Sequence, residues 1–255
     1  MNNLALERIL NEKLNADAIT DYAPNGLQVE GCRTIRKIIT GVTATLPLIE
    51  QAIAKNADAV LVHHGYFWKS EDPCIRGMKG KRIKQLLTND INLYAYHLPL
   101  DIHPELGNNA QLAKHIGAVR FQGLEDKPNS VPAVAEFDQP ISADELKQRL
   151  EKSLQRHVIL CDEFVGDFPQ KDIKKVGICS GGGQGFIDMA FERGCDAFIS
   201  GEISEQTTHS AREQGIYYFA CGHHASERDG IKALGEWLAA EYGLDVEFID
   251  IDNPA

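Results

Sequence analysis

Two hydrophobic patterns alternate along the chain. Short apolar runs are typical of buried strands in a parallel or mixed sheet, and they lie at 27–29, 37–42, 58–62, 91–96, 134–137, 158–161, 175–179, 196–200, 216–221 and 246–249. Between them, apolar residues at helical spacing predict helices at 4–14, 46–56, 81–87, 108–116, 142–154, 186–193, 204–214 and 227–242. Strands that alternate with helices in this way indicate the α/β class.

Part of this pattern occurs twice. Residues 37–64 can be laid over residues 175–202 without a gap, at a shift of 138 residues. Identical residue types meet at Lys37, Ile49, Ala52, Asp58 and Ala59. The same shift places the first helix on the helix at 142–154. Chance similarity between βα units is the alternative, but the common order of elements favours a duplicated α/β unit.

Histidines and carboxylates follow three of the predicted strands. They are His63 and His64 after the strand at 58–62, His97 and Asp101 after 91–96, and His223 and Glu227 after 216–221. Ligands of open α/β sheets collect beyond the carboxyl ends of strands. Two repeats that face each other through these ends would bring all six side chains into one cleft.

This combination of side chains points to metal binding. Imidazole and carboxylate ligands suit zinc, manganese or iron, and one carboxylate can bridge two ions that activate a water molecule. Glu227 is expected in the first turn of a helix, where the helix dipole favours a carboxylate. Pro99 argues against a helix between His97 and Asp101, so we expect a loop there. The alternative is that these are hydrogen-bonded polar residues at strand ends.

Two further features have more than one interpretation. The loop Gly181–Gly185 precedes a predicted helix and could bind an anion, but it lacks the complete dinucleotide fingerprint, and a tight β–α turn is the better interpretation. Tyr66, Phe67 and Trp68 follow the paired histidines. They could stack on a base or ring, pack in the core or contact another subunit.

Composition narrows the function classes. The 255 residues carry a formal net charge of −11, which argues against broad electrostatic binding to nucleic acid or anionic membranes. The N-terminal residues have no signal-peptide pattern, and no apolar run approaches the ~20 residues of a membrane span. Six cysteines lack C-x-x-C spacing, and Cys161, Cys179 and Cys195 are expected as buried core thiols. We therefore expect a cytoplasmic protein.

Several motifs together resemble the Nif-three-like family, whose bacterial members are named GTP cyclohydrolase type 2 homologues. The motifs are DYAPNGLQVEG at 21–31, VHHG at 62–65, HLPLD at 97–101, GNN at 107–109, SGE at 200–202 and GHHASE at 222–227. The resemblance covers nearly the whole chain. It implies two intertwined, duplicated α/β repeats with mixed sheets.

The resemblance also implies a two-metal centre. Its ligands would be His63, His64, Asp101, His223 and Glu227. Glu227 would be the bridge, and His97 a nearby acid/base or supporting residue. We expect a first repeat over residues 1–124 and a second over 125–255, with 222–255 packing back to complete the metal site. The family forms toroidal hexamers with metal sites facing an inner cavity, and the same is expected here.

The sequence therefore predicts a dinuclear metal-dependent hydrolase with two zinc, iron or manganese ions per chain. Its substrate would be GTP or a related purine nucleotide, with His97 and Glu227 as catalytic residues. The alternative is a non-catalytic metal-binding ring that acts in metal handling or as an adaptor. A ring that threads nucleic acid suits the expected shape but not the acidic charge.

Overall fold

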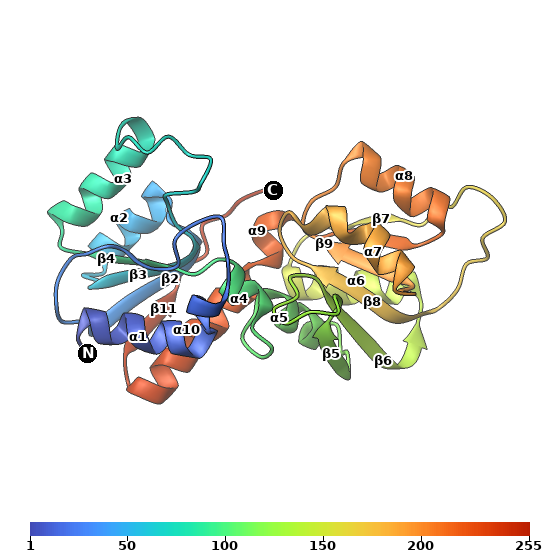
Figure 1. Ribbon diagram of the computed structural model, residues 1–255, viewed down its shortest axis with the longest axis horizontal. Coiled ribbons are helices and arrows are strands. Elements are labelled where there is room, and N and C mark those ends of the chain that lie inside the picture. The colour runs from blue at the N-terminus through green and yellow to red at the C-terminus, as the bar shows by residue number, and fades with distance from the viewer. The chain divides into compact units, whose positions relative to one another are not determined.

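The computed structural model describes residues 1–255, which form two compact units, each with its own mixed sheet (Figure 1). Unit 1 consists of Met1–Leu106 and Gly230–Asp252, and unit 2 of Gly107–Asp229 and Asn253–Ala255. The chain thus leaves unit 1, builds unit 2 and then returns to unit 1. The boundary between repeats at residues 124 and 125 stays a prediction.

Unit 1 is built on a five-stranded sheet with the order β1-β4-β3-β2-β11. Its elements are α1 (Asn3–Leu14), a 3-10 turn (Ala16–Ala18), β1 (Gly26–Val29), β2 (Lys37–Thr43), α2 (Leu46–Ala54), β3 (Ala59–His64), α3 (Gly77–Thr88), β4 (Asn92–Ala95), α4 (Leu98–Ile102), most of α10 (Arg228–Tyr242) and β11 (Asp245–Phe248). Strand β1 is antiparallel to β4, and the other pairs are parallel. The last strand of the chain therefore completes the first sheet.

Alternate residues of these strands face two separate helical layers. Ile38 and Leu61 pack in one core with α1 and α10, whereas Ile39 and Val60 pack in another with α2 and α3. Figure 1 shows the two helix pairs on opposite faces of the sheet. The strands are apolar on both faces because both faces are covered, which explains why their sequences are continuous apolar runs.

Unit 2 is built on a six-stranded sheet with the order β5-β6-β8-β9-β10-β7. Its elements are α5 (Asn108–His115), β5 (Arg120–Gly123), β6 (Ala133–Ile141), α6 (Ala143–Leu154), β7 (Ile159–Cys161), β8 (Ile173–Cys179), a 3-10 turn (Gly183–Phe186), α7 (Ile187–Glu192), β9 (Ala197–Ser200), α8 (Glu205–Gln214), β10 (Tyr217–Ala220) and α9 (His223–Ser226). Strands β8, β9 and β10 are parallel, and their other neighbours are antiparallel. Helices α5 and α6 pack in one core, and α7 and α8 in the other.

The two units repeat one arrangement, which confirms the duplicated α/β class. The parallel strands β2-β3-β4 correspond to β8-β9-β10, and an antiparallel strand flanks β4 and β10 alike. Asp58 Oδ2 accepts hydrogen bonds from the amides of Arg36 and Lys37 at 2.8 and 2.9 Å. Asp196 Oδ2 accepts the same two bonds, both at 3.0 Å, from the amides of residues 174–175. The repeated aspartate thus ties the start of one strand to its neighbour.

The expected loop between His97 and Asp101 is a short helix, so that prediction was wrong. Pro99 lies in the first turn of α4, where a helix does not need its missing N–H. The amides of Leu100 and Asp101 both donate to the carbonyl of His97, at 2.9 and 3.2 Å. The helix at 81–87 was also predicted too short, since α3 begins at Gly77.

All six cysteines are free thiols. Cys161, Cys179 and Cys195 are buried, as expected from their apolar surroundings. Burial raises the pKa of the Cys195 thiol to about 11, so it stays protonated at neutral pH. Among the helices, none combines the length and apolar character that crossing a membrane requires.

Candidate metal centre

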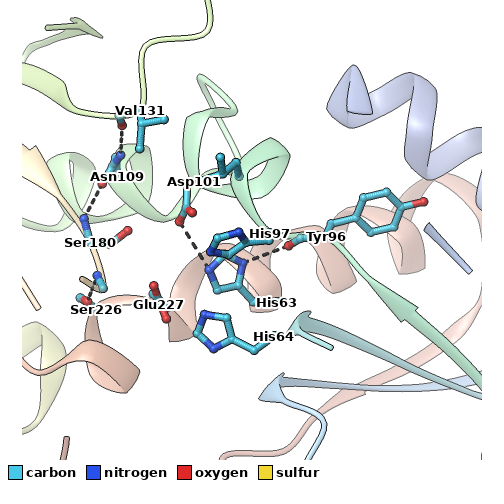
Figure 2. A network of polar contacts seen from close by, with 12 residues as sticks. His63, His64, Tyr96, His97, Asp101, Asn109, Val131, Ser180, Ser226 and Glu227 are labelled. Carbon is cyan, nitrogen blue, oxygen red and sulfur yellow. Dashed lines mark hydrogen bonds and ion pairs between the residues drawn. The ribbon is translucent and has the colours of Figure 1, made fainter. Parts of the chain in front are cut away.

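Three histidines cluster at the carboxyl end of the unit 1 sheet. His63 and His64 are the last residues of β3, and His97 lies between β4 and α4. One ring nitrogen of each lies within 4.8 Å of those of the other two. His63 is fully buried, whereas His64 and His97 are half-buried. Figure 2 shows the three rings gathered at this edge.

A carboxylate joins this cluster from α4. Asp101 is 7% exposed, and its Oδ1 lies 3.5 Å from His63 Nε2 (Figure 2). The opposite ring nitrogen, His63 Nδ1, lies 2.9 Å from the carbonyl of Tyr96. A carbonyl only accepts, so Nδ1 carries a hydrogen, and Nε2 of a neutral His63 presents a lone pair toward Asp101. A second proton or a metal cation is therefore needed between these two groups.

The other two histidines of unit 1 are also held through Nδ1. His64 Nδ1 lies 3.2 Å from Thr43 Oγ1, and His97 Nδ1 lies 2.7 Å from Asp21 Oδ1. Metal-binding histidines are usually held through the ring nitrogen that does not bind the metal. The cluster has the arrangement expected of such ligands.

Asp21 is a residue that sequence reasoning did not assign. It is 9% exposed and accepts hydrogen bonds from Tyr22 N, Asn25 Nδ2 and Leu98 N at 2.6, 3.0 and 2.8 Å, besides its contact with His97. Burial alone would raise the pKa of Asp21, but the hydrogen bond and charge of His97 and the other donors outweigh it and lower the pKa to about 2. The only sequence signal was its position in the turn-rich motif at 21–31.

Unit 2 places one histidine, His223, between two carboxylates. His223 begins α9, and Glu227, 3% exposed, directly follows this helix. His223 Nδ1 lies 2.8 Å from Glu202 Oε1, and its Nε2 lies 3.3 Å from Glu227 Oε2. Glu202 was also missed as a site residue. The repeat contained its signal, because the 138-residue shift places Glu202 on His64.

The two carboxylates raise the pKa of His223. The hydrogen bond of Glu227 raises the pKa most, burial opposes it, and the charge of Glu227 and the contact with Glu202 raise it further, to about 9. Without a metal ion, His223 is therefore protonated at neutral pH. In both units, a histidine Nε2 faces a buried carboxylate oxygen, at 3.5 and 3.3 Å, where a proton or a metal ion can lie between them. This donor set fits zinc, iron or manganese.

Comparisons with known proteins agree with the motifs. The sequence model of Duf34/NIF3 (NGG1p interacting factor 3) matches residues 1–254. The chain belongs to the Duf34/NIF3 family. It is 65% identical over 255 residues to a protein of Haemophilus influenzae named GTP cyclohydrolase 1 type 2 homolog, and the match covers all of both chains. The resemblance inferred from the motifs is thereby confirmed.

Solved structures of relatives have the same fold. A structure described as protein ybgI, of unknown function, is 55% identical with a TM-score of 0.94. The crystal structure of TTHA1606 from Thermus thermophilus is 32% identical with a TM-score of 0.88. Both matches cover all of both chains. The Nif-three-like fold class expected from the sequence is confirmed.

The glycine loop of this Duf34/NIF3 chain is a tight β–α turn, as expected. The carbonyl of Gly181 accepts from the amides of Gly201 and Glu202 at 3.0 and 3.1 Å, and its own amide donates to Ser226 Oγ at 2.9 Å. Gly181 has φ +60°, and a Cβ there would lie 2.0 Å from Glu227 Oε1. The absence of a side chain at Gly181 therefore makes room for the Glu227 carboxylate.

The close approach at Gly181 leads to a first prediction. Gly181→Ala is expected to displace Glu227, to weaken metal binding at least about tenfold and to destabilise the fold by roughly 1–2 kcal/mol through its left-handed backbone. Gly185→Ala in the same loop is the matched control, because its Cβ would meet nothing within 4 Å. Zinc titration and thermal unfolding of both variants measure the two effects. Equal behaviour of the two variants would contradict this role of Gly181.

A second prediction concerns pH. A metal ion that binds His223 must displace its proton, so zinc affinity should rise about tenfold per pH unit up to pH ~9 and level off above it. In the metal-free protein, the stability of the fold changes with pH in the opposite direction. The stability due to protonated His223 is full below pH 6.5 and is lost as pH rises through about 9. Calorimetric zinc titrations at pH 7, 8 and 9 test the predicted rise in zinc affinity, and a pH-independent affinity would contradict it. Glu227→Gln removes the main cause of the raised pKa and should flatten the stability profile.

Proposed function

We propose that this protein is a dinuclear metal-dependent hydrolase that acts on a purine nucleotide such as GTP. The observation that carries the proposal is the repeated pairing of a fixed histidine with a buried carboxylate, His63 with Asp101 at 3.5 Å and His223 with Glu227 at 3.3 Å. The nucleotide is suggested by the names of the relatives, which are homologues of a GTP cyclohydrolase.

The ligand set that we propose is the one that the family resemblance implies. Its members are His63, His64 and Asp101 from unit 1 and His223 and Glu227 from unit 2. This assignment is supported by the family pattern and by the donor chemistry of each group. With Glu227 shared between two ions, each ion would have three protein ligands, and catalytic metal sites keep further positions open for water or substrate.

The side chains around these ligands would handle protons and orientation. Bound divalent ions supply Lewis acidity and lower the pKa of coordinated water. His97 is held through Nδ1 by ionised Asp21, which fixes the tautomer of its ring. Its Nε2 can then accept a proton or return one, the acid/base role proposed for this residue. The carboxylate of Glu227 is expected to hold both ions in place.

We propose further that the chain assembles into a toroidal homohexamer with the metal sites facing an inner cavity, as the family resemblance implies. Light scattering coupled to size-exclusion chromatography gives the mass directly. A particle with about six times the 28.2 kDa of one chain supports the ring, and a monomer contradicts it.

The activity is tested with untagged protein that has been loaded with manganese, iron or zinc and incubated with GTP. We expect turnover that His97→Gln lowers in kcat by roughly 100-fold, with metal content unchanged. His209→Gln, an exposed histidine on α8, is the control and should retain full activity. No conversion of GTP or of any other purine nucleotide by fully loaded protein would contradict the proposal.

A second candidate is a non-catalytic metal-binding adaptor. It is favoured by the description of the family, which names an interacting factor. This candidate predicts exchangeable metal and a protein partner without turnover. Robust turnover together with slow metal exchange would exclude it.

A further inference from the structure

Two aromatic side chains flank His97 in unit 1. The ring of Trp68 lies edge-on to the His97 imidazole, with ring centroids 4.9 Å apart. The ring of Tyr22 lies 6.3 Å from the same imidazole and is tilted by 58°. Trp68 also lies 5.9 Å from His64. The histidine cluster is therefore bordered by aromatic rings from two loops that are distant in sequence.

Hydrogen bonds hold both loops in place. The amide of Lys69 donates to the carbonyl of Tyr22 at 2.8 Å and so joins the two loops. The amide of Glu71 donates to the carbonyl of Trp68 at 2.9 Å, and Tyr22 N donates to Asp21 Oδ1 at 2.6 Å. The backbone positions of both rings are thus set before any ligand binds, which lowers the entropic cost of binding.

Core packing does not explain these two rings. Tyr66, two residues before Trp68, is the core residue of its loop, since it is 4% exposed and donates its hydroxyl to the Ala44 carbonyl at 2.7 Å. Tyr22, in contrast, is 63% exposed although its neighbour Asp21 is buried. Trp68 is half-buried and belongs to none of the four core clusters. An aromatic side chain kept at the surface on a fixed backbone is typical of a binding site.

We propose that Tyr22 and Trp68 recognise the planar heteroaromatic ring of the substrate, and that they determine specificity for a nucleobase over its sugar phosphate. This inference rests on the proposed function. Base–aromatic stacking contributes about 1–3 kcal/mol per base and needs only exposed π-faces. Both rings border the His97 imidazole, with ring centroids 4.9 and 6.3 Å from it. A ring is therefore the part of a nucleotide that fits beside His97.

The two tryptophans of the chain allow a direct test. Trp237 lies on α10 against Lys13 and Tyr242, so Trp237→Phe leaves Trp68 as the sole tryptophan reporter. GMP is expected to quench Trp68 fluorescence in zinc-loaded protein, whereas ribose 5-phosphate is not. Tyr22→Leu should raise the Kd for GMP roughly tenfold. Tyr242→Leu, a change of an exposed tyrosine on α10, should leave that Kd unchanged.

The outcomes separate this inference from the proposed function. No quenching by GMP, or equal quenching by ribose 5-phosphate, would overturn the inference. So would a Tyr22→Leu variant that binds GMP normally but changes its oligomeric mass, because the rings would then be a contact between copies. GMP binding to loaded protein that converts neither GTP nor any other purine nucleotide would support ring recognition and reject the hydrolase. Turnover with an unchanged KM in Tyr22→Leu would retain the hydrolase and reject ring recognition.

Discussion

Glu227→Ala is expected to leave the purified protein with neither metal ion, whereas His64→Ala is expected to lose only one. The reason is the proposed sharing of the Glu227 carboxylate, since two cations a few ångströms apart need a negative group between them. Elemental mass spectrometry of untagged protein purified without chelator measures the content. About two ions per chain in the unaltered protein, near zero in Glu227→Ala and about one in His64→Ala are the expected values.

The control for this experiment is Glu236→Ala, which removes an exposed glutamate of α10 and should keep both ions. Thermal unfolding with and without EDTA adds an independent readout, because a ligand present at 100 times its Kd stabilises by about 2.7 kcal/mol. EDTA should lower the Tm of the unaltered protein but not that of Glu227→Ala. If Glu227→Ala retains one ion, the two units bind metal separately and the shared carboxylate is wrong.

A chain that ends at Asp229 is expected to lose the folded state of unit 1. It would lack the part of α10 that places Ile231, Leu234 and Leu238 in the core against α1, each with 0% exposure. Removal of one buried leucine costs about 2–5 kcal/mol, so loss of three such side chains approaches the whole stability of a domain, about 5–15 kcal/mol. The truncation also removes β11, which pairs with β2.

Hydrogen exchange measured by mass spectrometry resolves this effect by unit. Amides of β2, β3 and β4 should lose protection in the truncated chain, whereas β8, β9 and β10 should keep it because their core lies within unit 2. As single changes, Leu234→Ala should cost about 3 kcal/mol and exposed Glu236→Ala within about 0.5 kcal/mol. Full protection of β2 in the truncated chain would refute the prediction.

The strands and the histidines at their ends could be predicted because each depends on local sequence. An apolar run identifies a strand covered on both faces, and the residues that follow it lie at the sheet edge. The repeat was detectable for the same reason. Asp58 and Asp196 make equivalent backbone hydrogen bonds at the start of equivalent strands, so the same residue type occurs at both positions. Local pattern thus accounted for the fold class and for the metal-ligating candidates.

The partners of those histidines could not be predicted in the same way. Asp21 lies 76 residues from His97, and Glu202 lies 21 residues from His223. Their contacts depend on how loops fold over the sheet edge, and local sequence patterns do not encode the path of a loop. The prediction of a loop at Pro99 was wrong for a different reason. A proline blocks a helix interior but fits its first turn, and the sequence did not reveal where the turn begins.

The return of the chain to its first unit also has a consequence for synthesis on the ribosome. Residues 1–106 emerge before unit 2, but their sheet waits for β11, which is translated only after Gly107–Asp229 of unit 2. Until then the β2 edge is open, and the surface that α10 covers is exposed. Unit 2 is nearly continuous in sequence and can fold earlier. During synthesis, the segment of unit 1 made first therefore exposes an open strand edge and apolar surface, the two features that make folding intermediates prone to aggregation.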